Sequence, residues 1–298
     1  MKTLSVTVGL SAFNEQRNIL KFINSVVRQK GRNFKLNKVL IISDGSTDKT
    51  VEIVQNLKNP KIEIVDNKDN LGQMTRLREL YKKFDSDILI QTDADVVFSE
   101  HTIESVVRVM RSDERISMCG GDIVPVESTS LIARANLLSV NIYRKIKRTL
   151  RGGNNIFSAT GPMLAFRREF IKNIASIPGN VVCNDRYIYL KCIQESFVYR
   201  FVPEAVVYYN LPSSLKDHIK QARRFKLSKE QLYDIFPKNL VDRELSIPKS
   251  MYLRYGIEEF LKHPLLAVYI FLVNKYSDLT KKRSKINRGI WEIVATTK

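Results

Sequence analysis

Short apolar runs alternate with longer mixed segments along the first hundred residues. Runs of the kind that form buried strands occur at Leu4–Leu10, Lys38–Ile42, Lys61–Val65 and Asp87–Ile90. The segments between them carry apolar residues at helical spacing, over 18–30, 50–57 and 74–84. Strands that alternate with helices in this way predict βαβ units, and therefore an α/β domain with a mostly parallel sheet flanked by helices.

Polar loops follow three of these predicted strands: SAFNEQ, SDGSTDKT and QTDAD. In open α/β sheets, ligands bind beyond the carboxyl ends of the parallel strands, so these loops predict a binding site. The ordinary explanation of SDGSTD is a helix N-cap, with Ser46 or Thr47 as the capping residue and Asp48 in the first turn. That explanation leaves Asp44 without a role.

Asp93 and Asp95 are carboxylates one residue apart, directly after an apolar strand. Such a pair can offer oxygens to one Mg²⁺ or Mn²⁺ ion that also binds a diphosphate. The ion would neutralise the charge that grows on a diphosphate leaving group. Asp-x-Asp triplets are common in surface turns, so the neighbouring polar loops are what favour a metal site here.

The rest of the chain is less regular and strongly basic. The 298 residues carry a net charge of +18, and residues 101–298 hold 33 Lys or Arg against 18 Asp or Glu. A surplus of this size indicates an anionic partner surface. The segment Ser130–Arg151 alternates apolar and basic residues, and predicts either a solvated basic helix or a helix that lies on an acidic membrane.

Pro264–Val273 is an uninterrupted apolar run. Its length is about half of the roughly 20 residues that a helix needs to cross a bilayer. Polar or basic residues flank it, and the basic run KKRSK follows at 281–285. We expect an interfacial or re-entrant anchor, or a helix docked on the domain, rather than a single span.

Several classes of protein fit the sequence poorly. The three cysteines form no CxxC pair, which argues against a disulfide scaffold or a Cys-based zinc site and suits a reducing compartment. The N-terminus runs directly into the first predicted strand, so we expect no signal peptide. No glycine lies between Gly9 and Gly31, unlike the phosphate loop of a nucleotidyltransferase, and no GxGxxG follows a strand. Nucleic-acid-binding motifs are also missing, and we expect no nucleic-acid partner.

Six motifs occur in the order seen in family-2 inverting glycosyltransferases, which the chain resembles over roughly residues 4–226: SAFNE, SDGSTDKT, NLGQMTRLRE, QTDAD, GPMLAFRR and QARRF. The resemblance implies the GT-A fold over residues 1–230, followed by a helical extension at 231–298. It also implies that a sugar moves from a nucleotide-diphosphate donor, with UDP favoured, to an acceptor hydroxyl with the help of Mg²⁺ or Mn²⁺.

The resemblance also assigns residues around the donor. Asp93 would lie beside the nucleotide, and Asp95 would be the direct metal ligand. Gly72 and Gln73 would close over the donor, although the family often has Lys at the position of Gln73. The nucleotide pocket itself would be lined by Ala12, Asn14, Glu15 and Asp44.

Asp185, in CNDRY, resembles the catalytic base of the family. An inverting transfer is one displacement at the anomeric carbon, and a carboxylate must take the proton of the acceptor. The usual Glu-Asp pair is Asn184-Asp185 here, so the acidic neighbour of the base is replaced. The ordinary alternative for Asp185 is a surface ion pair with Arg186 or Lys191.

Two further motifs would serve the acceptor and the diphosphate. Gly161, with Pro162, resembles the turn that supports the acceptor side. QARRF at 221–225 resembles the QxxRW motif of polysaccharide-forming members, with Gln221 first, Arg224 able to pair with the diphosphate and Phe225 able to stack on the acceptor sugar. The alternative is a basic amphipathic helix over 214–229.

The motif order, the basic second half and the apolar run together predict sugar transfer to a lipid-linked glycan or polysaccharide precursor. We expect this at the cytoplasmic side of the cell membrane, with peripheral or re-entrant attachment; the alternative location is the soluble cytoplasm. The alternative function is a basic membrane- or nucleic-acid-binding module with a degenerate nucleotide-sugar site. It would leave the carboxylates at three loop ends unexplained.

Overall fold

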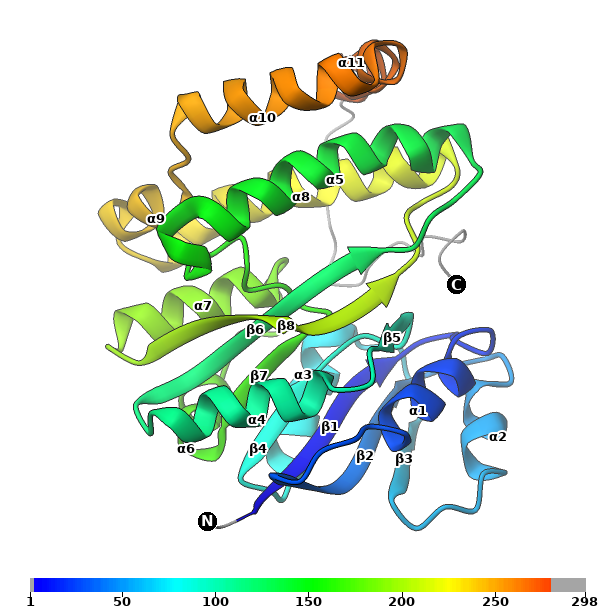
Figure 1. The fold of residues 1–298 in the computed structure, drawn as a ribbon. Helices are drawn as coiled ribbons and strands as arrows, with labels where there is room; N and C mark the ends of the chain where they lie inside the picture. Colours follow the sequence, from blue (N-terminus) through cyan, green and yellow to red (C-terminus); the bar gives the residue numbers. More distant parts are fainter. Residues whose placement is uncertain (1–2, 280–298) are drawn as a thin grey trace.

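The computed structural model describes residues 3–279, apart from the side chains of 220–229 and 277–279. Over this range a single curled sheet has the strand order β3-β2-β1-β4-β7-β6-β8-β5, with helices on both faces (Figure 1). The strands are β1 Leu4–Ala12, β2 Phe34–Asp44, β3 Ile62–Asn67, β4 Ile88–Gln91, β5 Val96–Phe98, β6 Ile116–Pro125, β7 Leu164–Arg167 and β8 Val198–Tyr209.

Helices fill the connections between strands and the whole C-terminal part of the described chain. They are α1 Ile19–Val27, α2 Thr50–Gln55, α3 Gln73–Lys83, α4 Thr102–Ser112, α5 Leu131–Thr149, η1 Leu150–Gly153, α6 Arg168–Ile174, α7 Asn184–Gln194, α8 Leu215–Ile235, α9 Lys238–Leu245, α10 Lys249–Lys262 and α11 Pro264–Leu279.

The α/β class predicted from the sequence is confirmed, with a sheet of mixed direction. Strands β3, β2, β1 and β4 run parallel, as the βαβ pattern requires. β7 then pairs antiparallel with both β4 and β6, β8 runs parallel to β6, and β5 closes the sheet antiparallel to β8. The carboxyl ends of β1, β2 and β4 therefore meet at one edge, which is where the polar loops begin.

Both faces of the parallel half are buried, and this explains the continuous apolar runs. Along β2, Val39 and Ile41 belong to the core that includes α1 and α4, whereas Leu40 and Ile42 belong to the other core, with α3, α6 and α7. These four side chains are fully buried, and burial of each contributes about 1.5–3 kcal/mol. A shift of one residue in the register of β2 would exchange the two sets.

The start of α2 differs from the expected N-cap. Its capping residue is Lys49, whose side chain makes no capping hydrogen bond, so the prediction of Ser46 or Thr47 was wrong. Asp48 makes the capping hydrogen bond instead: its Oδ1 accepts the backbone N–H of Thr50 at 2.9 Å. Ser46 and Thr47 are engaged by the loop that follows β1.

The basic segment forms α5, and most of its cations have ion-pair partners that neither expectation included. Its charged side chains pair with carboxylates inside the protein. Asp122 on β6 is fully buried and receives Arg144, Lys147 and Arg148 at 2.7–2.8 Å. Lys145 pairs with two glutamates of α10 and Arg151 with a glutamate of α9. The cations at 144–151 therefore link α5 to β6, α9 and α10, and the Asp122–Lys147 pair is the buried part of this layer.

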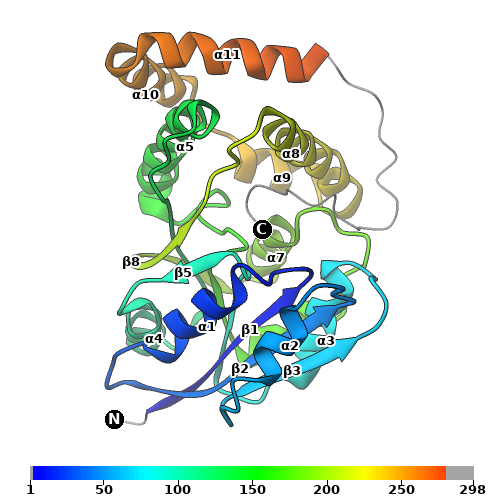
Figure 2. The ribbon, with the colours of Figure 1, turned by 90° about the vertical axis from the view of Figure 1, so that its right-hand side faces the viewer.

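Helices α10 and α11 form the outermost layer. Both pack on α5, which separates them from the sheet (Figures 1 and 2). The expected domain boundary at residue 230 falls inside α8, and Leu232, Phe236 and Val241 share a core with α3 and α7. The division into two domains stays a prediction. None of the helices between residues 3 and 279 is both long and apolar enough to cross a bilayer.

Candidate active site

The loops after β1 and β2 are tied together by the side chain of Asn14. This residue has φ of 55°, in the left-handed region that Asn tolerates better than most residues. Its Oδ1 accepts the backbone N–H groups of Thr47 and Asp48, at 2.8 and 3.3 Å. The next residue, Glu15, is buried, and its backbone N–H donates to Thr50 Oγ1 at 2.7 Å. Ala12, at the end of β1, is buried beneath this junction.

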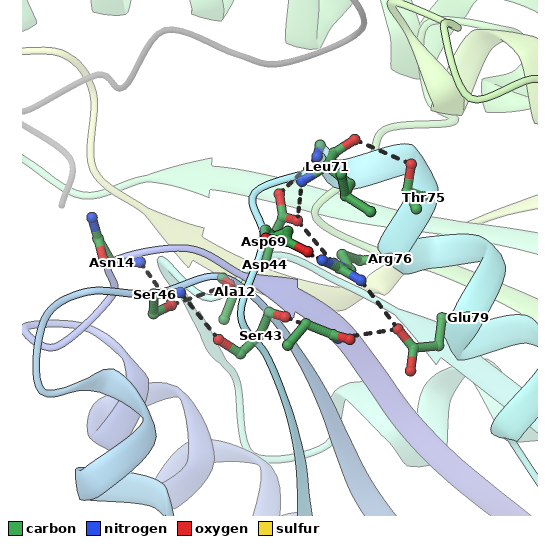
Figure 3. A network of polar contacts seen from close by, with 12 residues as sticks. Ala12, Asn14, Ser43, Asp44, Ser46, Asp69, Leu71, Thr75, Arg76 and Glu79 are labelled. Atoms are coloured by element: carbon green, nitrogen blue, oxygen red, sulfur yellow. Dashed lines mark hydrogen bonds and ion pairs between the residues drawn. The ribbon is translucent and has the colours of Figure 1, made fainter.

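Asp44 organises the loop between β3 and α3 (Figure 3). Its two oxygens accept the backbone N–H groups of Leu71 and Gly72, each at 2.9 Å, and Oδ1 also accepts Arg76 Nε at 2.8 Å. Asp44 and Arg76 are both nearly inaccessible to solvent, so this is a buried ion pair. Arg76 also donates to the backbone carbonyl of Asp69. Asp44 thus shapes the loop that faces the ligand edge.

Arg76 was not singled out by the sequence reasoning, although it lies in the quoted motif NLGQMTRLRE. The available signal was its spacing. Gly72 begins the turn into α3, and a residue four positions later lies one helical turn further on, on the same side. Gly72 itself has φ of 90°, a backbone conformation that favours glycine.

Asp93 follows the end of β4 and contacts the first residue of α3. Its Oδ1 accepts Gln73 Nε2 at 3.2 Å. The neighbouring Thr92 donates its hydroxyl to the carbonyl of Pro162 at 2.7 Å, which fastens the turn at 160–163 to the strand end. Two motifs that lie 70 residues apart in sequence therefore form one structure.

Asp185 lies in the first turn of α7, on the other side of this turn. Its Oδ2 accepts the backbone N–H of Gly161 at 3.3 Å, and its Oδ1 accepts the backbone N–H of the next residue, Arg186, at 2.7 Å. A methyl group added at Gly161 would lie 4.0 Å from Asp93 Oδ2 and 3.8 Å from Asn184 Oδ1. Gly161 is thus flanked by the strand-end carboxylate and the start of α7. The alternative partner Lys191 pairs with Glu195 instead.

Asp95 lines a separate cavity of about 180 Å³, shared with α1 and the end of β8. Its other lining residues are Asn18, Lys21, Val96, Val97, Val126, Tyr208, Tyr209 and Asn210. Burial raises the pKa of Tyr209 to about 12. Sequence reasoning missed Tyr208 and Tyr209, because they reach Asp95 only through the pairing of β5 with β8.

A larger cavity, of about 370 Å³, lies between α2 and the start of β3. It is at the amino end of β3, whereas the polar loops follow the carboxyl ends of the strands. It is therefore unrelated to the carboxylates described here.

The donor set fits a metal ion that is shared with a substrate. No group of three or more Asp, Glu, His or Cys side chains in the described part of the chain could hold a metal by itself. Mg²⁺ commonly binds through one or two carboxylates plus substrate phosphate oxygens rather than through an all-protein cage. Asp93 and Asp95 are carboxylates of this kind, but in the structure Asp93 contacts Gln73 whereas Asp95 lines the cavity beside β8.

The QARRF motif lies in α8, and its side chains are outside the described residues. The roles expected for Gln221, Arg224 and Phe225 stay predictions. The KKRSK run at 281–285 is outside them as well.

The mixed sheet has the GT-A glycosyltransferase fold, as the family profile and the similar solved structures show. The chain belongs to glycosyl transferase family 2, whose profile matches residues 7–175, more than half of its length. The family inferred from the motif order is therefore confirmed.

Similar proteins include two curated bacterial enzymes. Poly-beta-1,6-N-acetyl-D-glucosamine synthase of Staphylococcus aureus is 22% identical over 224 residues, covering 74% of this chain and 53% of that protein. The O-antigen chain rhamnosyltransferase RfbN of Salmonella typhimurium is 24% identical over 176 residues, covering 57% and 56%. This chain thus spans about half the length of these relatives.

Two solved structures share the fold. The mannosyltransferase PcManGT of Pyrobaculum calidifontis, in complex with GDP-Man and Mn²⁺, has a TM-score of 0.59 at 16% identity, covering 95% of this chain and 77% of that one. TarS 1–349 of S. aureus in complex with UDP has a TM-score of 0.53 at 16% identity, covering 81% and 69%.

Proposed function

We propose that this protein is an inverting glycosyltransferase that moves a sugar from a nucleotide-diphosphate sugar to an acceptor hydroxyl. The observation that carries the proposal is the turn at Gly161, which brings Asp93 and Asp185 together at the ligand edge of the sheet. Asp93 is suited to the donor side and Asp185 to the acceptor side. Family membership supports the donor-side role of Asp93, which lies inside the matched residues 7–175, whereas the role of Asp185 is proposed from its position beside Gly161.

Asp185 is the proposed base. Its two oxygens accept the backbone N–H groups of Gly161 and Arg186, and these hydrogen bonds hold the carboxylate in place. An ionised carboxylate can take the proton from the acceptor hydroxyl as the bond to the anomeric carbon forms. Such positioned base catalysis typically contributes about 10²–10⁴-fold to the rate.

Asp93 and Asp95 are the proposed residues that hold a divalent cation together with the donor diphosphate. The cation would stabilise the negative charge of the leaving group. Asp44 has an indirect, positioning role, because it holds the 69–72 loop against which the nucleotide would bind. A UDP-sugar is the favoured donor, and a lipid-linked glycan or polysaccharide precursor is the favoured acceptor. The proposed location is the cytoplasmic side of the cell membrane, with peripheral attachment.

The test separates donor binding from chemistry. Isothermal titration with UDP and GDP, each with and without Mn²⁺, identifies the donor class in the wild-type protein. We expect Asp95→Ala to lose the metal-dependent part of nucleotide binding and Asp185→Asn to keep it. With the donor so identified, Asp185→Asn should lower the rate of transfer by about 10²–10⁴-fold.

Asp85→Asn is the matched control, because Asp85 is highly exposed and pairs with Arg168 at the opposite end of β4. It should leave both binding and transfer unchanged. Full transfer activity in Asp185→Asn would refute the proposed base, and metal-dependent binding that survives in Asp95→Ala would refute the metal role.

A further inference from the structure

Helix α11 is apolar around most of its circumference, yet only one side of it is covered. Ile270 and Val273 are buried against Ala135 of α5. On the other side Leu265 is 86% exposed and Phe271 63% exposed. A helix that is apolar all round is normally buried on every side. The outer side of α11 therefore requires a partner.

Helix α10 extends the same exposed surface. Leu253, Ile257 and Leu261 follow each other at intervals of four residues, so they share one side of the helix, and each is more than half exposed. Tyr255 and Glu259 lie on the buried side, where Glu259 pairs with Lys145 of α5. We call the exposed surface the C-terminal apolar face and define it by Leu253, Ile257, Leu261, Leu265, Phe271 and Leu272.

The C-terminal apolar face lies at one end of the molecule. In Figures 1 and 2, α10 and α11 lie roughly in one plane above α5, at the far end from α1 and α2. A flat body could meet this face along the length of both helices without contact with the sheet.

The charges around the face indicate which partner covers it. Lys249, Arg254, Lys262 and Lys275 are exposed on the same two helices. Glu259 is engaged by Lys145, and Glu258 by both Lys145 and Lys262, so Lys249, Arg254 and Lys275 are the cations left for a partner. A second copy of the chain, related by a two-fold axis, would bring these like charges together. Anionic lipid headgroups would attract them.

We propose that the C-terminal apolar face docks on an anionic lipid bilayer and enters one leaflet, with α10 and α11 parallel to the membrane plane. Tyr252 and Tyr276 are exposed beside the face, and tyrosine favours the boundary between lipid and water. The 16 residues of α11 extend about 24 Å, less than the roughly 30 Å of a bilayer core. The inference rests on the membrane location proposed above, and names the surface responsible.

Flotation of the full chain with vesicles tests the proposal. Phosphatidylcholine vesicles with phosphatidylglycerol should bind the protein more strongly than phosphatidylcholine alone. The double variant Leu265→Glu/Phe271→Glu should lower binding by about tenfold or more, since each substitution removes a large apolar side chain from the lipid contact. Leu20→Glu on α1 is the matched control, exposed to 42%, and should bind like the wild type.

A charge variant separates the electrostatic attraction to lipid headgroups from the insertion of apolar side chains. Lys249→Gln/Lys275→Gln should weaken binding to anionic vesicles and leave binding to phosphatidylcholine unchanged. Because Leu265 is almost fully exposed, the single variant Leu265→Glu gives a second measurement with little effect on folding. Vesicle binding by the double variant at the wild-type level would overturn the proposal. So would a wild-type dimer, seen by light scattering, that the same substitutions dissociate.

Nucleotide titration keeps this proposal distinct from the sugar-transfer chemistry. A double variant that loses vesicle binding and keeps nucleotide binding is folded, and supports docking through this face. A wild-type protein that binds vesicles through the face but binds neither UDP nor GDP would support docking while contradicting the donor site.

Discussion

Replacement of Asp122 by Asn removes the only carboxylate described among Arg144, Lys147 and Arg148. Burial alone would raise the pKa of Asp122, but the attraction of Lys147 and hydrogen bonds from all three cations outweigh it and lower the pKa to about 2. In the Asn variant the two arginines can turn towards solvent, because they are partly exposed. Lys147 cannot, because its side chain is only 4% exposed.

The expected loss of stability is about 3–5 kcal/mol, the usual cost of leaving a buried charge without its partner. This is a large share of the roughly 5–15 kcal/mol that stabilises a typical domain. Urea denaturation followed by circular dichroism measures it. The double variant Asp122→Asn/Lys147→Met should recover part of the loss, because it removes the stranded cation as well.

Asp113 provides the matched control. Its pKa is also lowered to about 2, chiefly by a hydrogen bond from Arg115, but that pair is at the surface. Asp113→Asn should therefore change stability little. Equal losses in Asp122→Asn and Asp113→Asn would refute the argument that burial of Lys147 sets the cost.

Three further predictions follow from the same structure. The pKa of Asp122 is lower in the folded than in the unfolded chain, so the ionised carboxylate stabilises the fold above about pH 4, and about 2 kcal/mol of this stability is lost as the pH falls towards 2. The thermal midpoint, measured against pH, should show this loss in the wild type and not in Asp122→Asn. Gly161→Ala meets only ordinary contacts, so it should fold normally, yet its methyl group would crowd bound substrate; overpacking by about 1–3 kcal/mol should lower kcat/KM by about 5- to 150-fold, and unchanged kinetics would place the substrate elsewhere. At Gly45 φ is 73°, and a new Cβ would lie 2.9 Å from the backbone N of Asn70, in the loop that Asp44 holds. Gly45→Ala should therefore displace this loop and weaken nucleotide binding, whereas wild-type affinity would show that the loop does not contact the nucleotide.

The sequence alone determined the local elements and the edge at which the site forms. The apolar runs predicted β1 to β4, and the parallel direction of these strands placed Asn14, Asp44 and Asp93 at one edge. These features depend on patterns within a few residues and on the fixed direction of βαβ connections, both of which a sequence records directly. The order of six short motifs added the family.

Only the tertiary structure decided which partner each charged side chain has. The sequence shows α5 as a row of cations, but their carboxylates come from β6, α9 and α10, far away along the chain. In the same way, Arg76 pairs with Asp44 across 32 positions, and Gly161 joins Asp185 to the end of β4. Ion pairs form by proximity in space, and the residue types alone do not specify which distant segments pack together. The uncovered side of α11 follows from the same cause, because an apolar run becomes a buried helix or an exposed face only when its neighbours are in place.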